Sequence, residues 1–155
     1  MTFCPKMVTL IEERGREKGR ADILEKEVKL MAREMIHTDK APAAVGPYVQ
    51  AVKVQGMIYC SGQLGLDPAE GALAEGVVAQ AHQSMKNLGA VLKEAGSDYS
   101  KIVKTSIFLA DMADFAAVNE VYQSYFDGVF PARSCVEVSN LPKGGLVEIE
   151  CIAEA

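Results

Sequence analysis

The alternation of apolar and polar residues after residue 47 predicts a series of short strands. Two strand-like runs, residues 48–54 and 57–63, are joined by Gln55 and Gly56, a pair suited to a tight hairpin because glycine accepts a positive φ. A loop rich in glycine, proline and aspartate follows over residues 65–76. Further strands are predicted at residues 102–109, 131–138 and 146–153.

Apolar residues at three- and four-residue spacing predict two helices among these strands. The first has the clearest stripe in the chain and stops at Gly96; its apolar positions are Val77, Val78, Ala81, Met85, Leu88, Val91, Leu92 and Ala95. The second covers residues 112–126, with Asp111 as candidate N-cap. Because each helix has one apolar stripe, each can cover one face of a sheet. Together with the order β-β-α-β-α-β-β, this predicts an α+β domain. If both helices share a face, the other face is left open.

Residues 1–34 have a different character from the rest of the chain. They carry eight Lys and Arg residues and seven Asp and Glu residues, with only a weak helical stripe at Ile23, Leu24, Val28 and Met31. A mitochondrial transit peptide is poor in acids, so that interpretation is disfavoured. We expect residues 1–34 to be a partly helical or disordered extension and residues 35–155 to be the folded domain.

Composition and charge narrow the function classes. Of the 155 residues, 49% are apolar and 24% charged, which is typical of one soluble globular domain. Residues 35–155 hold eight Lys and Arg against fourteen Asp and Glu, a net charge of −6 that disfavours nucleic-acid binding. The four cysteines form no Cys-x-x-Cys pair and no signal peptide is evident, so we expect reduced thiols, a cytosolic protein and no metal site.

Arg133 is the only arginine after Met35, where every other cation is lysine. A planar guanidinium grips a carboxylate through two parallel hydrogen bonds, which an ammonium group does not. A surface ion pair with an acid such as Glu137 is the competing explanation, and such pairs contribute about 0–1 kcal/mol. The pattern alone leaves carboxylate binding and a surface ion pair equally open.

The last two predicted strands have mixed faces. The final strand sets Val147, Ile149 and Cys151 against Glu148 and Glu150, and the strand before it sets Ala132, Ser134, Val136 and Val138 against Arg133, Cys135 and Glu137. A mixed outer face indicates burial against another subunit, so self-association is a hypothesis.

Glu148 is a candidate for holding water or relaying a proton, with simple solvent exposure as the alternative, and for Glu150 we favour solvent exposure.

Four other residues offer chemistry with an equally plain structural explanation. Cys135 has no indicated histidine partner and is interpreted as a small core residue. Tyr48 follows the rigid Gly46-Pro47 turn and either contacts a ligand or packs. Ser61-Gly62 joins a hydroxyl to a backbone without a side chain, which marks either a ligand site or a bulge.

Seven stretches together resemble the RidA/YjgF family, the reactive intermediate deaminases. They are residues 41–48 (APAAVGPY), 61–63 (SGQ), 103–105 (VKT), 114–119 (DFAAVN), 130–138 (FPARSCVEV), 141–143 (LPK) and 147–150 (VEIE). The block around Arg133 is the most specific. The resemblance implies a chorismate-mutase-like fold with both helices on one face of a mixed sheet. It also implies a homotrimer whose sheets pack into a central barrel, with active sites between subunits. Residues 1–34 lie outside it.

The resemblance also assigns roles to the candidate residues. Arg133 would grip the substrate carboxylate, while Glu148 and the backbone at Cys135 would act on the attacking water. Tyr48, Ser61, Gly62 and Asn119 would line the substrate pocket. The implied reaction is cofactor-free hydrolysis of 2-aminoacrylate, 2-iminopropanoate and 2-iminobutanoate to 2-keto acids and ammonia.

Two alternatives stay open beside this 2-iminobutanoate/2-iminopropanoate deaminase activity. A non-catalytic trimeric module that binds small carboxylates would need Arg133 but not Glu148. A ribonuclease or translation inhibitor would have to act on a polyanion, which the net charge of −6 disfavours. The expected partners are therefore small imino acids and further copies of the chain, with neither nucleic acid nor membrane.

Overall fold

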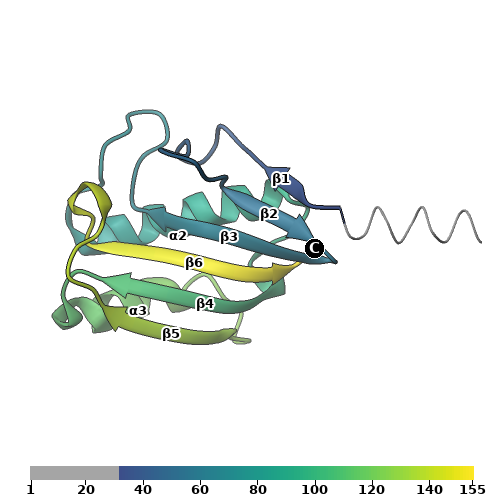
Figure 1. Ribbon diagram of the computed structural model, residues 1–155. Coiled ribbons are helices and arrows are strands. Elements are labelled where there is room, and N and C mark those ends of the chain that lie inside the picture. Colours follow the sequence, from purple (N-terminus) through teal and green to yellow (C-terminus); the bar gives the residue numbers. More distant parts are fainter. Residues whose placement is uncertain (1–31) are drawn as a thin grey trace, which may run out of the picture. The chain divides into compact units, whose positions relative to one another are not determined.

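Two helices cover one face of a six-stranded mixed sheet (Figure 1). The computed structural model describes residues 32–155, so most of the predicted extension lies outside the described residues. The strands are β1 (Glu34–Ile36), β2 (Ala51–Val54), β3 (Met57–Leu64), β4 (Ile102–Leu109), β5 (Ala132–Glu137) and β6 (Val147–Glu154). Within the described residues the α-helices are α2 (Gly76–Glu94) and α3 (Phe115–Gln123). The predicted α+β class with both helices on one face is confirmed.

The strand order in the sheet is β1-β2-β3-β6-β4-β5. Every neighbouring pair is antiparallel except β4 and β5, which run parallel because α3 connects them. The C-terminal strand β6 therefore lies inside the sheet, between β3 and β4. Its residues contact both halves of the chain.

The core lies between the sheet and the helices. From β6, alternate residues Val147, Ile149, Cys151 and Ala153 are buried, and α2 buries Ala81, Met85, Leu88, Val91 and Leu92 against them. These are the apolar positions whose spacing predicted the elements. Full burial of each large apolar side chain contributes about 1.5–3 kcal/mol to the free energy of folding. This packed layer holds the sheet in place, and with it the side chains on the opposite face.

The structure corrects several predicted boundaries. β1 is a short edge strand that the residue pattern did not predict, and β2 begins at Ala51, three residues after the predicted start. The predicted helix over residues 112–126 opens with a 3₁₀ turn, Met112–Asp114, and its α-helical part ends at Gln123. The hairpin at Gln55 and Gly56 is confirmed, because both residues have a positive φ, of 52° and 76°.

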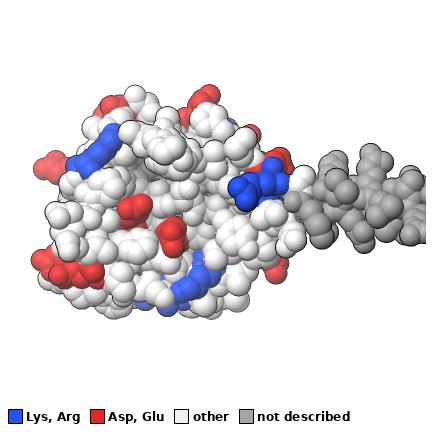
Figure 2. Space-filling view, viewed as in Figure 1, with Lys and Arg blue, Asp and Glu red and all other residues white. Residues whose placement is uncertain are grey.

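The sheet face opposite the helices carries mixed side chains. Glu148 and Glu150 lie on it, as do the half-exposed Tyr59 and Val136. Figure 2 shows acidic atoms near the middle of a mostly uncharged surface in this view. The open face predicted from the two one-sided helices is thus present, and its exposed apolar rings and branched side chains are typical of a surface that another chain covers. No helix within residues 32–155 has the length and apolarity to cross a membrane.

Candidate functional site

The predicted site residues gather in two separate hollows. The first, which we call the glutamate cavity, has a volume of about 530 Å³ and is lined by Tyr48, Gln50, Ser61, Gly62, Lys143 and Glu148, among others. The second, the arginine hollow, has a volume of about 380 Å³ and is lined by Asn119, Tyr122, Gln123, Phe130, Pro131 and Arg133. Cys135 lines neither hollow.

A bulge in β3 shapes the floor of the glutamate cavity. The register between β3 and β6 shifts between Cys60 and Gln63, so Ser61 and Gly62 have no direct partner in the ladder. The Glu148 side chain lies against Gly62, where a Cβ atom would overlap the carboxylate oxygen Oε1. Glycine at this position therefore leaves the space that the carboxylate occupies. The bulge expected at Ser61-Gly62 is thus present, and both residues also line the cavity; ligand binding by them stays a prediction.

The Glu148 carboxyl is half-buried, and its pKa is raised above the usual value. Burial is the larger cause, because desolvation penalises the charged form, and the negative charge of Glu150 is the smaller one. A carboxyl with a raised pKa retains or accepts a proton more readily at neutral pH. Glu150, interpreted from sequence as a solvated residue, thus contributes to the electrostatics of the cavity.

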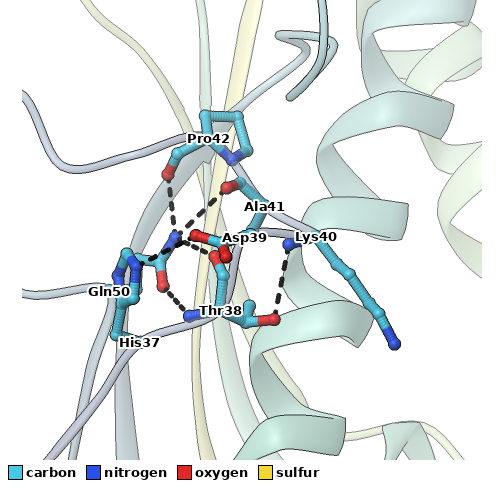
Figure 3. Close-up of polar contacts among 7 residues, drawn as sticks. All are labelled: His37, Thr38, Asp39, Lys40, Ala41, Pro42 and Gln50. Atoms are coloured by element: carbon cyan, nitrogen blue, oxygen red, sulfur yellow. Dashed lines mark hydrogen bonds and ion pairs between the residues drawn. The ribbon is translucent and has the colours of Figure 1, made fainter.

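The loop that forms one wall of the cavity is held by a buried glutamine (Figure 3). The Gln50 Oε1 atom accepts a 2.7 Å hydrogen bond from the Thr38 backbone N–H. Its Nε2 atom donates to the carbonyl oxygens of Thr38, Ala41 and Pro42 at 3.0, 3.3 and 2.9 Å. Gln50 is 2% exposed, so these bonds replace all of its contact with water and fix the loop against the sheet.

Tyr48 and Ser61 are both held at the cavity by backbone groups. The Tyr48 hydroxyl accepts from the Val45 N–H at 3.2 Å, and the side chain is half-exposed. The Ser61 hydroxyl donates to the Val49 carbonyl at 2.7 Å, which ties β3 to the segment before β2. Both hydroxyls therefore have defined positions at the wall of the cavity.

Arg133 is held in the arginine hollow by uncharged groups. Its Nη1 donates to the Asn119 Oδ1 at 2.7 Å, and its Cζ lies 4.9 Å from the ring centre of Tyr122 and 5.7 Å from that of Phe115. The competing ion pair with Glu137 is absent: that carboxylate accepts from the Met112 backbone N–H at 2.7 Å. Within residues 32–155 no carboxylate lies at salt-bridge distance from Arg133. The guanidinium charge is thus open to an external anion.

Cys135 packs beside the core rather than facing either hollow. It is partly buried and lies next to Ile107 in the β4–β5 ladder. Burial raises the pKa of its thiol, an effect that the nearby Arg133 charge opposes only in part. A thiol with a raised pKa is a poor nucleophile, which agrees with its interpretation as a small core residue.

The two hollows lie on opposite faces of the sheet. Arg133 is paired with Thr105 of β4, and Thr105 points toward the helices, where it bonds Tyr122. Glu148 is paired with Phe108 of the same strand. Residues an odd number of positions apart on a strand point to opposite faces, so Arg133 and Glu148 diverge. One chain therefore cannot bring its own arginine and glutamate to one substrate.

Several contributors were not identified from the sequence. Gln50 and Lys143 line the glutamate cavity, and Lys143 has a positive φ of 57° in the turn after β5. Tyr122 lies in the predicted helix over residues 112–126 and was given no role in the site. A buried glutamine beside a Pro-containing loop and a lysine next to two glycines were weak signals for these roles. Among residues 32–155, no group of three or more His, Cys, Asp or Glu side chains is placed to hold a metal ion.

The fold and the two hollows define a class: a small two-layer α+β protein with a carboxylate cavity on one sheet face and an open guanidinium on the other.

Residues 38–155 match the family model described as Endoribonuclease L-PSP. A mouse protein named 2-iminobutanoate/2-iminopropanoate deaminase is 57% identical over 122 residues, which is 78% of this chain and 90% of that protein. The chain therefore belongs to the L-PSP family, the RidA/YjgF family that its motifs resemble.

Solved structures agree with this assignment. RidA from an Antarctic Psychrobacter species superposes with a TM-score of 0.77 at 49% identity, covering 79% of this chain and 99% of that one. Escherichia coli TdcF with bound serine superposes with a TM-score of 0.77 at 42% identity, covering 79% of this chain and 98% of that one. The fold is thus shared over nearly the whole length of these relatives.

Proposed function

We propose that the chain is a deaminase that hydrolyses reactive 2-imino acids, such as 2-iminopropanoate and 2-iminobutanoate, to 2-keto acids and ammonia. The observation that carries the proposal is the state of Arg133, which neutral groups hold in place while its charge has no partner within residues 32–155. A guanidinium in this state is suited to a planar carboxylate, and every 2-imino acid has one. The mouse relative bears the name of this activity.

The reaction adds water across the C=N bond and then breaks the C–N bond. The Arg133 fork would hold the carboxylate and so fix the neighbouring imine carbon; positioning of this kind can lower a barrier by several kcal/mol. Glu148, whose pKa is raised, would hold the water and transfer its proton to nitrogen as the carbinolamine collapses. Water supplies the keto oxygen and ammonia leaves, so the atoms balance without a cofactor.

Because Arg133 and Glu148 lie on opposite faces of one sheet, we infer that each complete site forms between two chains. A contact that places one chain's glutamate cavity on the next chain's arginine hollow is head-to-tail, and repeated contacts of that kind form a ring when the rotation from chain to chain closes. A ring of three follows from the family resemblance. The half-exposed Tyr59 and Val136 on the open face support burial in such an assembly.

The substrate class fits what one relative binds. The TdcF structure contains serine, an amino acid with a carboxylate beside the carbon that carries nitrogen. A 2-imino acid has the same arrangement of carboxylate, carbon and nitrogen. The endoribonuclease in the family description fits this chain less well, because residues 35–155 carry a net charge of −6 that repels a polyanion.

Ammonia release from freshly generated 2-iminopropanoate tests the proposal. We expect Arg133→Ala to fold and assemble as the unchanged chain does and to lose nearly all turnover. Retained turnover would remove the carboxylate role of Arg133.

Glu148→Ala separates an enzyme from a carboxylate-binding module: an enzyme loses turnover while its affinity for pyruvate, the keto acid product, is preserved. RNA cleavage that survives both substitutions and repurification would instead favour a ribonuclease.

A further inference from the structure

Tyr122 lies directly beneath the Arg133 guanidinium. The Arg133 Cζ atom is 4.9 Å from the centre of the Tyr122 ring, closer than to the Phe115 ring at 5.7 Å. The negative face of an aromatic ring attracts a cation within about 6 Å, and the attraction strengthens where water is excluded. Tyr122 is only 3% exposed, so little water reaches the ring on which the guanidinium lies.

The Tyr122 ring itself has little freedom to move. Its hydroxyl lies 2.8 Å from the Thr105 Oγ1, and Thr105 is fully buried. Its ring packs on Phe126 with 4.8 Å between ring centres. Thr105 is also the direct partner of Arg133 in the β4–β5 ladder. Strand β4 therefore positions both the Arg133 backbone, through the β4–β5 ladder, and the Tyr122 ring, through Thr105.

Tyr122 supports the cation without neutralising it. Burial raises the pKa of the Tyr122 hydroxyl, so the phenol remains uncharged at physiological pH. A carboxylate at this place would hold the guanidinium equally well but would compete with the substrate for its charge. The Tyr122 ring lies against the guanidinium carbon, the Asn119 Oδ1 accepts from one of its N–H groups, and the remaining N–H donors stay available.

We propose that Tyr122 is a positioning residue, whose ring face holds the Arg133 guanidinium at the position from which it binds the substrate carboxylate. The inference rests on the proposed function, since it gives Tyr122 a role only through Arg133. It predicts that weakening the electrostatics of the ring, at constant size, lowers affinity for the carboxylate. A ring that merely fills core space would not be sensitive to such a change.

The test is to replace Tyr122 in the full chain with phenylalanine carrying zero, one, two or three ring fluorines. Fluorine withdraws electron density from the ring face and changes ring volume little. We expect KM for 2-iminopropanoate and Kd for pyruvate to rise stepwise, by about tenfold over the series, because a desolvated cation–π contact is of that size. We expect kcat to change by less than about twofold, since bound substrate is still held at Arg133.

Tyr125 provides the matched control. It belongs to the same aromatic cluster, where its ring lies 5.4 Å from that of Tyr99, and its hydroxyl bonds His82 rather than anything near Arg133. The same fluorinated series at Tyr125 should leave KM flat. A flat series at Tyr122, or an equal rise at Tyr125, would overturn the positioning role. If loss of the Tyr122 hydroxyl unfolds the chain, fluorinated tyrosines that retain it give the comparison, measured at a pH low enough to keep the phenol uncharged, because ring fluorines lower the pKa of the phenol.

Arg133→Ala, measured in parallel, separates this inference from the proposed function. If Arg133→Ala keeps its turnover, the proposed function fails and Tyr122 has nothing to position. If Arg133→Ala is inactive while the Tyr122 series is flat, the function stands and only the role of Tyr122 is lost.

Discussion

Gly62 and Glu148 lie against each other across β3 and β6, and the Glu148 carboxylate occupies the space that a side chain at position 62 would take. The φ of Gly62 is not in the left-handed region, so its backbone accepts alanine. The Glu148 side chain is flexible and partly accessible, and it would swing away from an added methyl group. The glycine thus sets the position of the proposed proton-transfer group.

We therefore predict that Gly62→Ala loses turnover while keeping its fold. We expect kcat for 2-iminopropanoate to fall about 100-fold, the lower range for loss of a positioned acid–base group. The melting temperature should fall by less than about 5 °C, because a side-chain rotation relieves the overlap. Stopped-flow ammonia release and calorimetry measure the two quantities. An active Gly62→Ala chain would show that the Glu148 position is not required.

The charge of Glu150 gives a pH prediction. Glu150 raises the pKa of Glu148, so Glu150→Gln should lower that pKa, although burial, the larger cause, keeps it above the ordinary value. If ionised Glu148 is the active form, activity is lost as pH falls through its pKa. The acid limb of kcat/KM against pH should then move to lower pH in Glu150→Gln. If the acid limb of the Glu150→Gln profile stays at the same pH, the limb does not report the titration of Glu148.

Gln50 links stability to substrate affinity. Gln50→Leu leaves the Thr38 N–H and the carbonyls of Ala41 and Pro42 without their buried partner, and each such group costs roughly 1–3 kcal/mol. We expect the free energy of unfolding to fall by about 3 kcal/mol or more, and KM to rise as the cavity wall loosens. Urea denaturation and steady-state kinetics check this.

Gln80→Leu is the control for that prediction. Gln80 is also a buried glutamine, bonded to the Ala74 carbonyl and the Leu146 N–H, but it does not line the glutamate cavity. It should lose similar stability with KM unchanged. Equal KM effects in the two variants would assign the Gln50 effect to general destabilisation.

Arg133→Lys tests geometry against charge. Lysine keeps the positive charge but has no planar fork, and it cannot use the Asn119 bond and the Tyr122 ring in the same way. We expect kcat/KM to fall about 10- to 100-fold, the loss of one charge-assisted hydrogen bond and of orientation. Raising the ionic strength should weaken both forms similarly. A fully active lysine variant would show that charge attraction alone is sufficient.

Much of the fold could be predicted because the residues that α2 and β6 bury between the helices and the sheet are mostly apolar. The stripe of α2 and the alternation in β6 each allow one interpretation, and they located both elements to within about two residues. β1 was missed because three residues are too few to show alternation. Tyr48 and Gln50 were assigned to a strand because the pattern does not reveal that Gln50 bonds the preceding loop instead.

The candidate site could be predicted only in parts. Arg133, Glu148, Tyr48, Ser61, Gly62 and Asn119 all line one of the two hollows, yet their division between two sheet faces depends on strand register, which sequence patterns do not define. The role of Tyr122 was hidden because a core aromatic and an aromatic beneath a cation have the same spacing. The roles of these residues in catalysis, the trimer and the cytosolic location remain predictions.

Mixed assemblies of two inactive variants test most directly whether each site forms between two chains. Arg133→Ala and Glu148→Ala chains, each inactive alone, are unfolded together in equal amounts and refolded. A cleft that takes Glu148 from one variant and Arg133 from the other is complete, so random mixing should restore about a quarter of the unchanged chain's ammonia release. A mixed assembly, confirmed by mass, that releases no ammonia above either parent would contradict the account.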